Sequence, residues 1–133
     1  PVPRGKLLGG SSAINGMAFV RGQPQDFDTW AQMGNQGWAY DDVLPFFKRM
    51  ESYEPGEGDD RFRGRSGPIP VTNPKPREPV FQALIKAAAE VGIAHNPDYN
   101  GATQDGIVMS QASIARGWRM STARCYLDPI RSR

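Results

Sequence analysis

The most informative stretch of the chain is residues 4–17, which read RGKLLGGSSAINGM. Gly9 and Gly10 let the backbone approach a ligand closely, because neither residue carries a Cβ atom that would collide with it. We interpret the stretch as a tight turn that opens a helix, with a serine as the N-cap. The hydroxyls of Ser11 and Ser12, together with the N–H groups at the start of that helix, would then form a site for an anion such as a phosphate.

Two common nucleotide-binding motifs do not occur in this stretch. The phosphate-binding loop of nucleoside triphosphatases ends in Gly-Lys-Ser/Thr, whereas Lys6 precedes the glycines here. The Gly-x-Gly-x-x-Gly spacing of Rossmann folds is not present either. The dipole of one helix contributes only about 0.3–1 kcal/mol, which can position a diphosphate but cannot hold a dinucleotide. As bare chemistry, the turn leaves a ligand site and a purely structural helix start as alternatives.

The composition describes a small globular chain with little excess charge. Its 133 residues are 38% hydrophobic and 23% charged, and the formal net charge is +2. Because acidic and basic residues alternate along the chain, we expect no nucleic-acid partner. No apolar run approaches the roughly 20 residues of a membrane span, so we expect no transmembrane segment. A single cysteine and a single histidine exclude a disulfide framework and metal sites built from several such residues; we predict no metal site and expect a cytoplasmic protein.

Both ends of the sequence read as cuts through a longer protein. Glycine and proline supply 15 and 12 of the 133 residues, about 20% together, against a usual figure of about 12%. The chain begins at Pro1 with no strand before its glycine-rich turn, and it stops at Arg133 without a closing apolar element. We therefore expect an internal segment of a longer chain.

Hydrophobic periodicity predicts an α+β fold, with short helices beside a few short antiparallel strands. Gly34 and Gly92 mark the ends of two helices, and Ser121 is expected to cap a third. Two consecutive residues, Arg116 and Gly117, are expected to form a turn. The predicted helices cover residues 24–33, 40–53, 78–91 and 121–129, and the predicted strands cover residues 68–71 and 107–114.

Several residues that could carry chemistry have simpler structural interpretations. His95 lies in a turn rich in Pro, Asn and Gly, and we expect it at the surface. Cys125 is expected to be a small buried side chain rather than a nucleophile. Gln111 and Ser113 on the predicted strand 107–114 could face a cavity or serve strand pairing. The three tryptophans are expected to anchor packing: Trp30, Trp38 and Trp118.

Charged and glycine residues gather in residues 54–65, which we expect to form a mobile surface loop. Its arginines, flanked by acidic residues, are expected to lie in solvent: Arg61, Arg63 and Arg65. A lid over a substrate entrance is the alternative interpretation of this loop.

The stretch from Gly5 to Asn15, with Phe19 four residues on, resembles the first signature of the glucose–methanol–choline (GMC) flavoprotein oxidoreductases. The resemblance runs from about Pro3 to Leu127 in the order of the family. Further blocks resemble its choline-dehydrogenase-like branch: residues 20–30, 37–48, 98–101 and 117–124, followed by Tyr126 and Leu127.

The resemblance implies a cofactor, FAD, and two groups of residues that contact it. The residues matching the family's FAD contacts are Gly9, Gly10, Ser11 and Ser12, and those matching the stretch along the isoalloxazine ring are Asn15, Gly16, Met17 and Ala18. Some relatives carry a histidine at or near this region that bonds covalently to the flavin. This sequence has none there, so non-covalent FAD is expected.

The resemblance also implies a two-domain parent protein. Residues 1–67 would belong to its α/β FAD-binding domain with connecting helices, and residues 68–133 would begin its antiparallel-sheet substrate domain. The implied activity is oxidation of a primary, choline-like alcohol by hydride transfer to flavin. The partners would be that alcohol and the remainder of the parent chain, which is cytoplasmic or attached peripherally to the inner membrane.

In proteins of this family the catalytic base is a histidine near the C-terminus, outside the region that this chain resembles. We therefore assign no catalytic residue here and expect the isolated chain to be inactive. Two alternatives stay open. Some relatives keep FAD structurally and act as hydroxynitrile lyases, and a stand-alone binding module without cofactor is the interpretation from a different class of protein.

Overall fold

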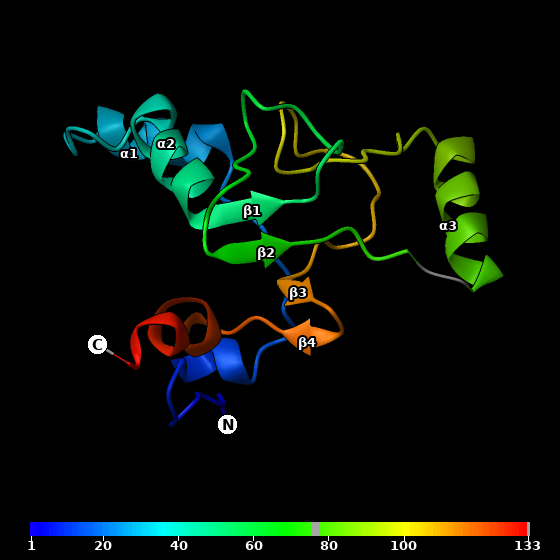
Figure 1. Ribbon diagram of the computed structural model, residues 1–133. Helices are drawn as coiled ribbons and strands as arrows, with labels where there is room; N and C mark the ends of the chain where they lie inside the picture. Colours follow the sequence, from blue (N-terminus) through cyan, green and yellow to red (C-terminus); the bar gives the residue numbers. More distant parts are fainter. Residues whose placement is uncertain (76–77, 133) are drawn as a thin grey trace.

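A computed structural model of the chain describes residues 1–75 and 78–132, so that Pro76, Arg77 and Arg133 lie outside the described residues. The fold is mixed α+β, as predicted, with short helices and two small sheets (Figure 1). The elements in chain order are η1 (Gly10–Ala13), α1 (Pro24–Gln32), α2 (Tyr40–Met50), β1 (Glu51–Tyr53), β2 (Ile69–Val71), α3 (Pro79–Glu90), β3 (Ile114–Ala115), β4 (Trp118–Arg119), η2 (Ala123–Leu127) and η3 (Asp128–Ile130).

Helices α1 and α2 form a pair held by aromatic side chains. Phe27 is buried and meets the rings of Trp30 and Phe47 edge to face, each with 5.5 Å between ring centroids. Trp30 in turn meets Trp38 at 5.6 Å. Trp30 and Trp38 thus pack against aromatic rings as expected, although each leaves about half of its surface exposed, and Trp118 leaves 62% exposed.

The sequence prediction extended α2 too far. The helix ends at Met50, and the next three residues form β1, which pairs in parallel with β2. Glu51 has the extended backbone angles of a strand, and the side chains of Glu51 and Tyr53 are both buried. A period of two places these side chains on one face, which a continued helix could not do. The parallel pairing also corrects the expectation that the strands would be antiparallel.

The predicted strand over residues 107–114 is not continuous. Ile107 and Ala112 make only isolated bridges, Ile107 to His95 and Ala112 to both Ala18 and Thr72. Only Ile114 belongs to a strand, β3, which pairs with β4 in an antiparallel hairpin. The segment fails to form one ladder because its successive residues meet different partners.

The hairpin turn at Arg116 and Gly117 is confirmed. Both residues have positive φ angles, 51° and 76°. A two-residue hairpin turn with such angles matches the right-handed twist of the strands that it joins.

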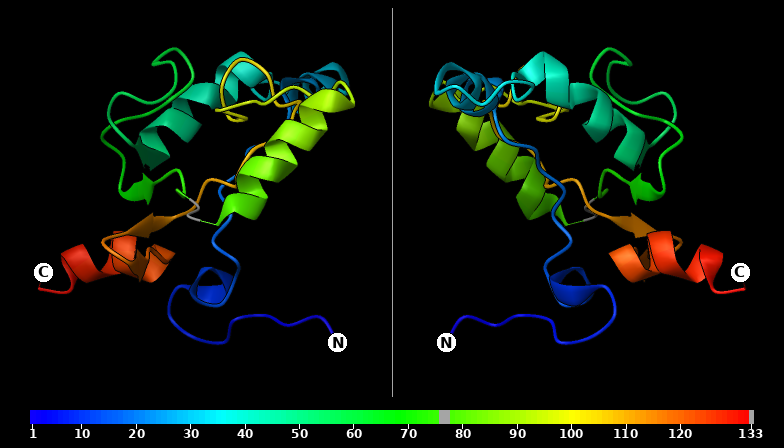
Figure 2. Two further views of the ribbon diagram at one scale, coloured as in Figure 1. Left: turned by 90° about the vertical axis from the view of Figure 1, so that its right-hand side faces the viewer. Right: turned by 90° about the vertical axis from the view of Figure 1, so that its left-hand side faces the viewer.

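Helix α3 confirms the periodicity of residues 78–91 and stands apart from the sheets in Figure 1, while Figure 2 shows it from two further directions. Ala88 is buried, while Val80 and Leu84 are exposed. Gly92, with φ 84°, follows the end of the helix. The last helical part of the chain differs from the helix predicted over residues 121–129, because Ala123–Leu127 form a π-helix, η2, and Asp128–Ile130 form the 3-10 turn η3. The expected Ser121 cap is wrong, because Thr122 is the N-cap and makes no side-chain cap hydrogen bond. Ser121 Oγ nevertheless accepts from the Arg124 N–H at 3.3 Å.

A small apolar core lies between the β1–β2 sheet and η2. Tyr53, Ile69, Val71 and Cys125 form it, with Met50 among the side chains packed against it. The burial expected of Cys125 is confirmed, and this burial raises the pKa of its thiol.

Beside this core lies a buried polar cluster built around the carboxylate of Glu51. Arg21 Nη2 donates to Glu51 Oε1 at 2.6 Å, and Arg63 donates through Nε and Nη2 at 3.0 and 3.1 Å. Arg63 also donates to Asp98 Oδ1 at 2.6 Å and to Gln111 Oε1 at 2.8 Å. We call the residues that meet here the Glu51 cluster: Arg21, Glu51, Arg63, Asp98, Asn100 and Gln111.

The Glu51 cluster corrects the expectation for residues 54–65. Arg63 has only 1% of its surface exposed and is held by ion pairs, whereas Arg61 lies in solvent and pairs with Asp59. Arg65 is partly buried and donates to backbone carbonyls of the loop. The loop is thus tied to the interior through one of its three arginines.

We predict that Glu51→Gln lowers the free energy of unfolding by about 3–5 kcal/mol, because two buried guanidinium groups lose the charge that compensates them. Urea unfolding of the purified protein measures this value. The control is Asp59→Asn, which removes the solvent-exposed ion pair with Arg61 and leaves the urea midpoint essentially unchanged. Equal midpoints for the two variants would contradict the central role of Glu51.

We also predict that Cys125 reacts with a thiol reagent much more slowly in the native protein than after denaturation, because burial both shields the thiol and raises its pKa. The thiol pKa is higher in the native state than in the unfolded state. The folded protein therefore loses stability as the pH rises from the ordinary thiol pKa through the raised one. Absorbance during labelling at pH 8, with and without urea, measures the two rates, and equal rates would refute the prediction.

Candidate functional site

The glycine-rich segment, residues 9–18, begins with a turn that only glycine adopts easily. Gly9 and Gly10 have φ angles of 88° and 53°, in the left-handed region that disfavours residues with a Cβ. The helix expected to follow is a single 3-10 turn, η1, and its N-cap is Gly9, without a side-chain hydrogen bond. The prediction of a serine N-cap is therefore wrong, and a helix this short has no N-terminal dipole of use to an anion.

Both serine hydroxyls of the segment bond to the chain itself. Ser11 Oγ accepts from the Gly5 N–H at 3.2 Å. Ser12 Oγ donates to the Gly9 carbonyl at 2.6 Å and accepts from the Thr122 N–H at 2.9 Å. These bonds brace the turn, and ligand contacts of the two hydroxyls stay a prediction.

A second local feature follows at residues 15–17. Asn15 Oδ1 accepts the N–H of Met17 at 3.0 Å, which closes an Asx turn. Met17 has a φ of 64°, an uncommon angle for a residue other than glycine, asparagine or aspartate. Such angles persist only where the surroundings impose them, and they gather at functional sites.

One edge of the segment is bound and the other is open. The carbonyl of Met17 accepts from the Ser113 N–H at 3.0 Å, and the Phe19 N–H donates to the Gln111 carbonyl at 2.8 Å. By contrast, the N–H groups of Gly16 and Ala18 donate to no acceptor within residues 1–75 and 78–132. Both residues are exposed.

The open edge therefore presents hydrogen-bond donors without partners. Besides the two backbone N–H groups, the Nδ2 of Asn15 has no acceptor in the described part of the chain, because only its Oδ1 is engaged. A Cβ built on Gly16 would meet nothing within 4 Å, so a flat group can approach this backbone closely. Donors fixed in this way stabilise negative charge that develops on a bound group.

A residue that sequence reasoning did not single out also bonds to the segment. Arg119 Nη1 donates to the Asn15 carbonyl at 2.6 Å and to Asn15 Oδ1 at 2.9 Å. The signal available in the sequence was that Arg119 belongs to one of the blocks resembling the family. Three members of the Glu51 cluster, Arg21, Asp98 and Asn100, also lie in such blocks, but nothing in the sequence indicated that they meet.

The other candidates lie outside this segment. His95 is exposed and lines a cavity of about 400 Å³ together with Gln82 and Ile85 of α3, in agreement with a turn position at the surface. The side chain of Gln111 is fully buried in the Glu51 cluster and faces no cavity in the described part of the chain, while its carbonyl pairs with the Phe19 N–H. Among residues 1–75 and 78–132, no group of three or more His, Cys, Asp or Glu side chains could hold a metal ion.

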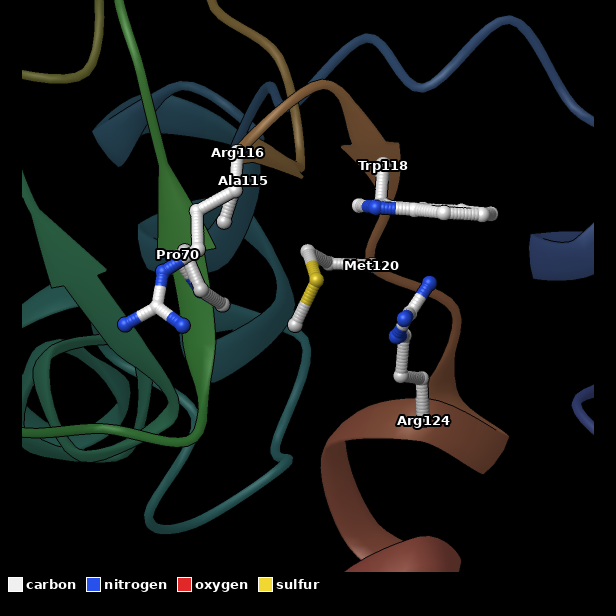
Figure 3. A pocket seen from close by; sticks show the side chains of 6 residues that line it. All are labelled: Pro70, Ala115, Arg116, Trp118, Met120 and Arg124. Atoms are coloured by element: carbon white, nitrogen blue, oxygen red, sulfur yellow. The ribbon is translucent and has the colours of Figure 1, made fainter.

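A further pocket of about 310 Å³ lies beside the β3–β4 hairpin. The guanidinium of Arg124 stacks 4.8 Å from the centre of the Trp118 ring, and Figure 3 shows the two side chains on the same side of the pocket. Met120 and Pro70 complete its apolar lining, and no acid–base pair is present among the lining residues.

No helix in the described ranges is long and apolar enough to cross a membrane.

The comparisons with known proteins cover almost the whole chain. The pattern of the GMC oxidoreductase family matches residues 1–133. Oxygen-dependent choline dehydrogenases of Sinorhizobium fredii and Rhizobium meliloti are each 47% identical over 131 residues, which is 98% of this chain and 24% of theirs.

Solved structures agree with the sequence comparison. An FAD-dependent oxidoreductase from Chaetomium thermophilum superimposes with a TM-score of 0.90 at 29% identity, over 98% of this chain and 24% of that one. Pyridoxine 4-oxidase from Mesorbium loti gives 0.84 at 32% identity, over 93% of this chain and 24% of that one. The chain thus spans about a quarter of the length of these relatives. Since the family pattern matches along its entire length and the same fold occurs in these enzymes, the chain belongs to the GMC oxidoreductase family.

Proposed function

We propose that this chain is the part of an FAD-dependent alcohol oxidoreductase that lines one side of the flavin with residues 9–18. The observation that carries the proposal is the open edge of the segment, where donors of Asn15, Gly16 and Ala18 have no partner in the described residues. Its relatives named choline dehydrogenase support a primary, choline-like alcohol as the substrate.

The residues present fit a flavin. Cβ atoms built on Gly10 and Gly16 would meet nothing within 4 Å, so the chain leaves free space beside each of them for a flat ring. Gly9, Ser11 and Ser12 shape the turn that carries it, and Met17 and Ala18 continue it. Residues 9–18 contain no His, Cys or Tyr to which a flavin could be bonded, which supports non-covalent FAD.

In this proposal FAD, when bound, is the oxidant and would accept the hydride of the alcohol. The chain's own residues act electrostatically. The Asn15 amide and the N–H groups of Gly16 and Ala18 stabilise the negative charge on the cofactor's reduced form, without having to reorient. No residue of this chain is assigned as the base that takes the hydroxyl proton, since His95 faces the cavity beside α3.

We further propose that residues 1–67 belong to the FAD-binding domain and that residues 68–133 begin the substrate domain. The contacts favour one refinement, because Thr122 bonds to Ser12 and Arg119 to Asn15, so the end of the chain returns to the FAD-binding part. The remainder of the parent chain is then a partner of this one. For its compartment we propose the cytoplasm, with which the free thiol of Cys125 is compatible.

We predict that the purified gene product containing this chain shows a flavin absorption spectrum after desalting. Denaturation should release the flavin, because FAD is bound non-covalently. Anaerobic addition of choline should bleach the flavin band, because the alcohol reduces it. A cyanohydrin-cleaving relative would keep its flavin oxidised while releasing an aldehyde. A colourless product that takes up no added FAD would overturn the proposal in favour of a binding module.

We also predict that Gly16→Val weakens FAD binding by at least about tenfold, because the added side chain obstructs the approach of the ring. Gly16 lacks a positive φ angle and has free space around it, so the protein without FAD should unfold at an unchanged temperature. The control is Ala89→Val on the exposed surface of α3, remote from the segment (Figure 1). Equal FAD affinity of both variants, measured by fluorescence titration, would argue against the segment as the flavin contact.

A further inference from the structure

Residues near the end of the chain hold the glycine-rich segment near its beginning. Arg119 Nη1 donates to Asn15 O at 2.6 Å, to Asn15 Oδ1 at 2.9 Å and to Ser12 O at 3.3 Å. Thr122 adds a bond from its N–H to Ser12 Oγ at 2.9 Å. In Figure 1 the turns η1 and η2 accordingly lie side by side. We call Arg119 and Thr122 the clasp.

The two halves of the clasp act on different parts of the segment. Thr122 bonds to Ser12 and, through Oγ1, to the Gly9 carbonyl at 3.2 Å. The fit there is tight, because a Cβ on Gly9 would lie 3.2 Å from Ala123. Arg119 reaches further along, to the amide of Asn15, which belongs to the open edge.

We propose that Arg119 is a positioning residue that fixes the amide of Asn15 with its Nδ2 turned toward the open edge. The inference rests on the proposed function of residues 9–18 as the flavin contact. It adds a residue that acts on the cofactor only through Asn15.

Hydrogen-bond donors around Asn15 fix the orientation of its amide. Asn15 Oδ1 receives two donors, the Met17 N–H and Arg119 Nη1. Turning the amide over would bring its NH₂ group against both donors, and neither a guanidinium nor a backbone N–H can accept a hydrogen bond. Because the bond from Arg119 is charge-assisted, it is roughly twice as strong as a neutral one. Without Arg119, only the Met17 N–H opposes rotation.

A purely structural brace would give different results from a positioning residue. If Arg119 only stabilised the turn, or acted on the flavin through its own charge, its removal would have the same effect whether or not Asn15 carried an amide. If it acts through Asn15, most of its effect vanishes once the amide is gone.

The test is a double-mutant cycle on the FAD-loaded gene product, with Arg119→Met, Asn15→Leu and the double variant. The readouts are the Kd for FAD and the flavin midpoint potential. We expect Arg119→Met to raise the Kd about tenfold and to lower the potential, but to change the Kd less than about threefold in the Asn15→Leu background. Equal effects in both backgrounds would overturn the proposal. Arg61→Met, which removes an exposed arginine remote from the segment, is the control for loss of charge.

Two further measurements cover the remaining outcomes. If Arg119→Met does not fold, Asn15→Asp keeps the partner of Arg119 but removes the Nδ2 donor, and an unchanged midpoint potential would overturn the proposal. In the protein without FAD, amide hydrogen exchange at Met17 should be faster in Arg119→Met than in the wild type, and equal rates would count against the inference. A wild-type product that binds no FAD would instead refute the proposed function, independently of this exchange result.

Discussion

The carboxylate of Glu51 is the point to which the rest of the structure is tied. Two guanidinium groups and the Gly64 N–H donate to it, from segments on both sides of it in the sequence. The Glu51 cluster is electrically balanced, with Arg21 and Arg63 against Glu51 and Asp98. A balanced set can be buried, whereas any of these charges alone would be strongly unfavourable in the interior.

The same cluster reaches the candidate site through Phe19. Asn100 Nδ2 donates to the Phe19 carbonyl at 3.0 Å and to Gln111 Oε1 at 2.8 Å, while the backbone of Gln111 accepts from the Phe19 N–H. Phe19 comes directly after the glycine-rich segment. The segment is thus fixed beyond its end by the Glu51 cluster and near its middle by Arg119, so that its open edge is held rigidly. Such preorganisation is what an electrostatic role in catalysis requires.

The sequence alone predicted what is local. Helices α1 and α3 and the turn at Gly117 follow from apolar spacing, glycine stops and turn chemistry, which act within a few residues. The end of α2 was missed because Glu51 and Tyr53 are drawn into a strand by partners far along the chain. Arg63 was misjudged for the same reason: its neighbours in sequence are charged and polar, and its partners Glu51, Asp98 and Gln111 lie 12 to 48 residues away. In the candidate site, the turn at Gly9 and Gly10 was predictable, but the hold of Arg119 on Asn15 was not, since it spans 104 residues.

The contact between Ser12 and Thr122 has a consequence for the order of events during synthesis. The two residues lie 110 positions apart, and a ribosome adding about 5–20 residues per second needs on the order of 5–20 s to cover such a distance. The glycine-rich segment therefore leaves the ribosome long before the residues that complete it. Until those later residues are made, Met17 and the apolar residues near it in the glycine-rich segment lack the contacts that hold them in the folded structure. A contact of such long range closes late and slows folding, so this chain has a window in which a chaperone can act before the candidate site is complete.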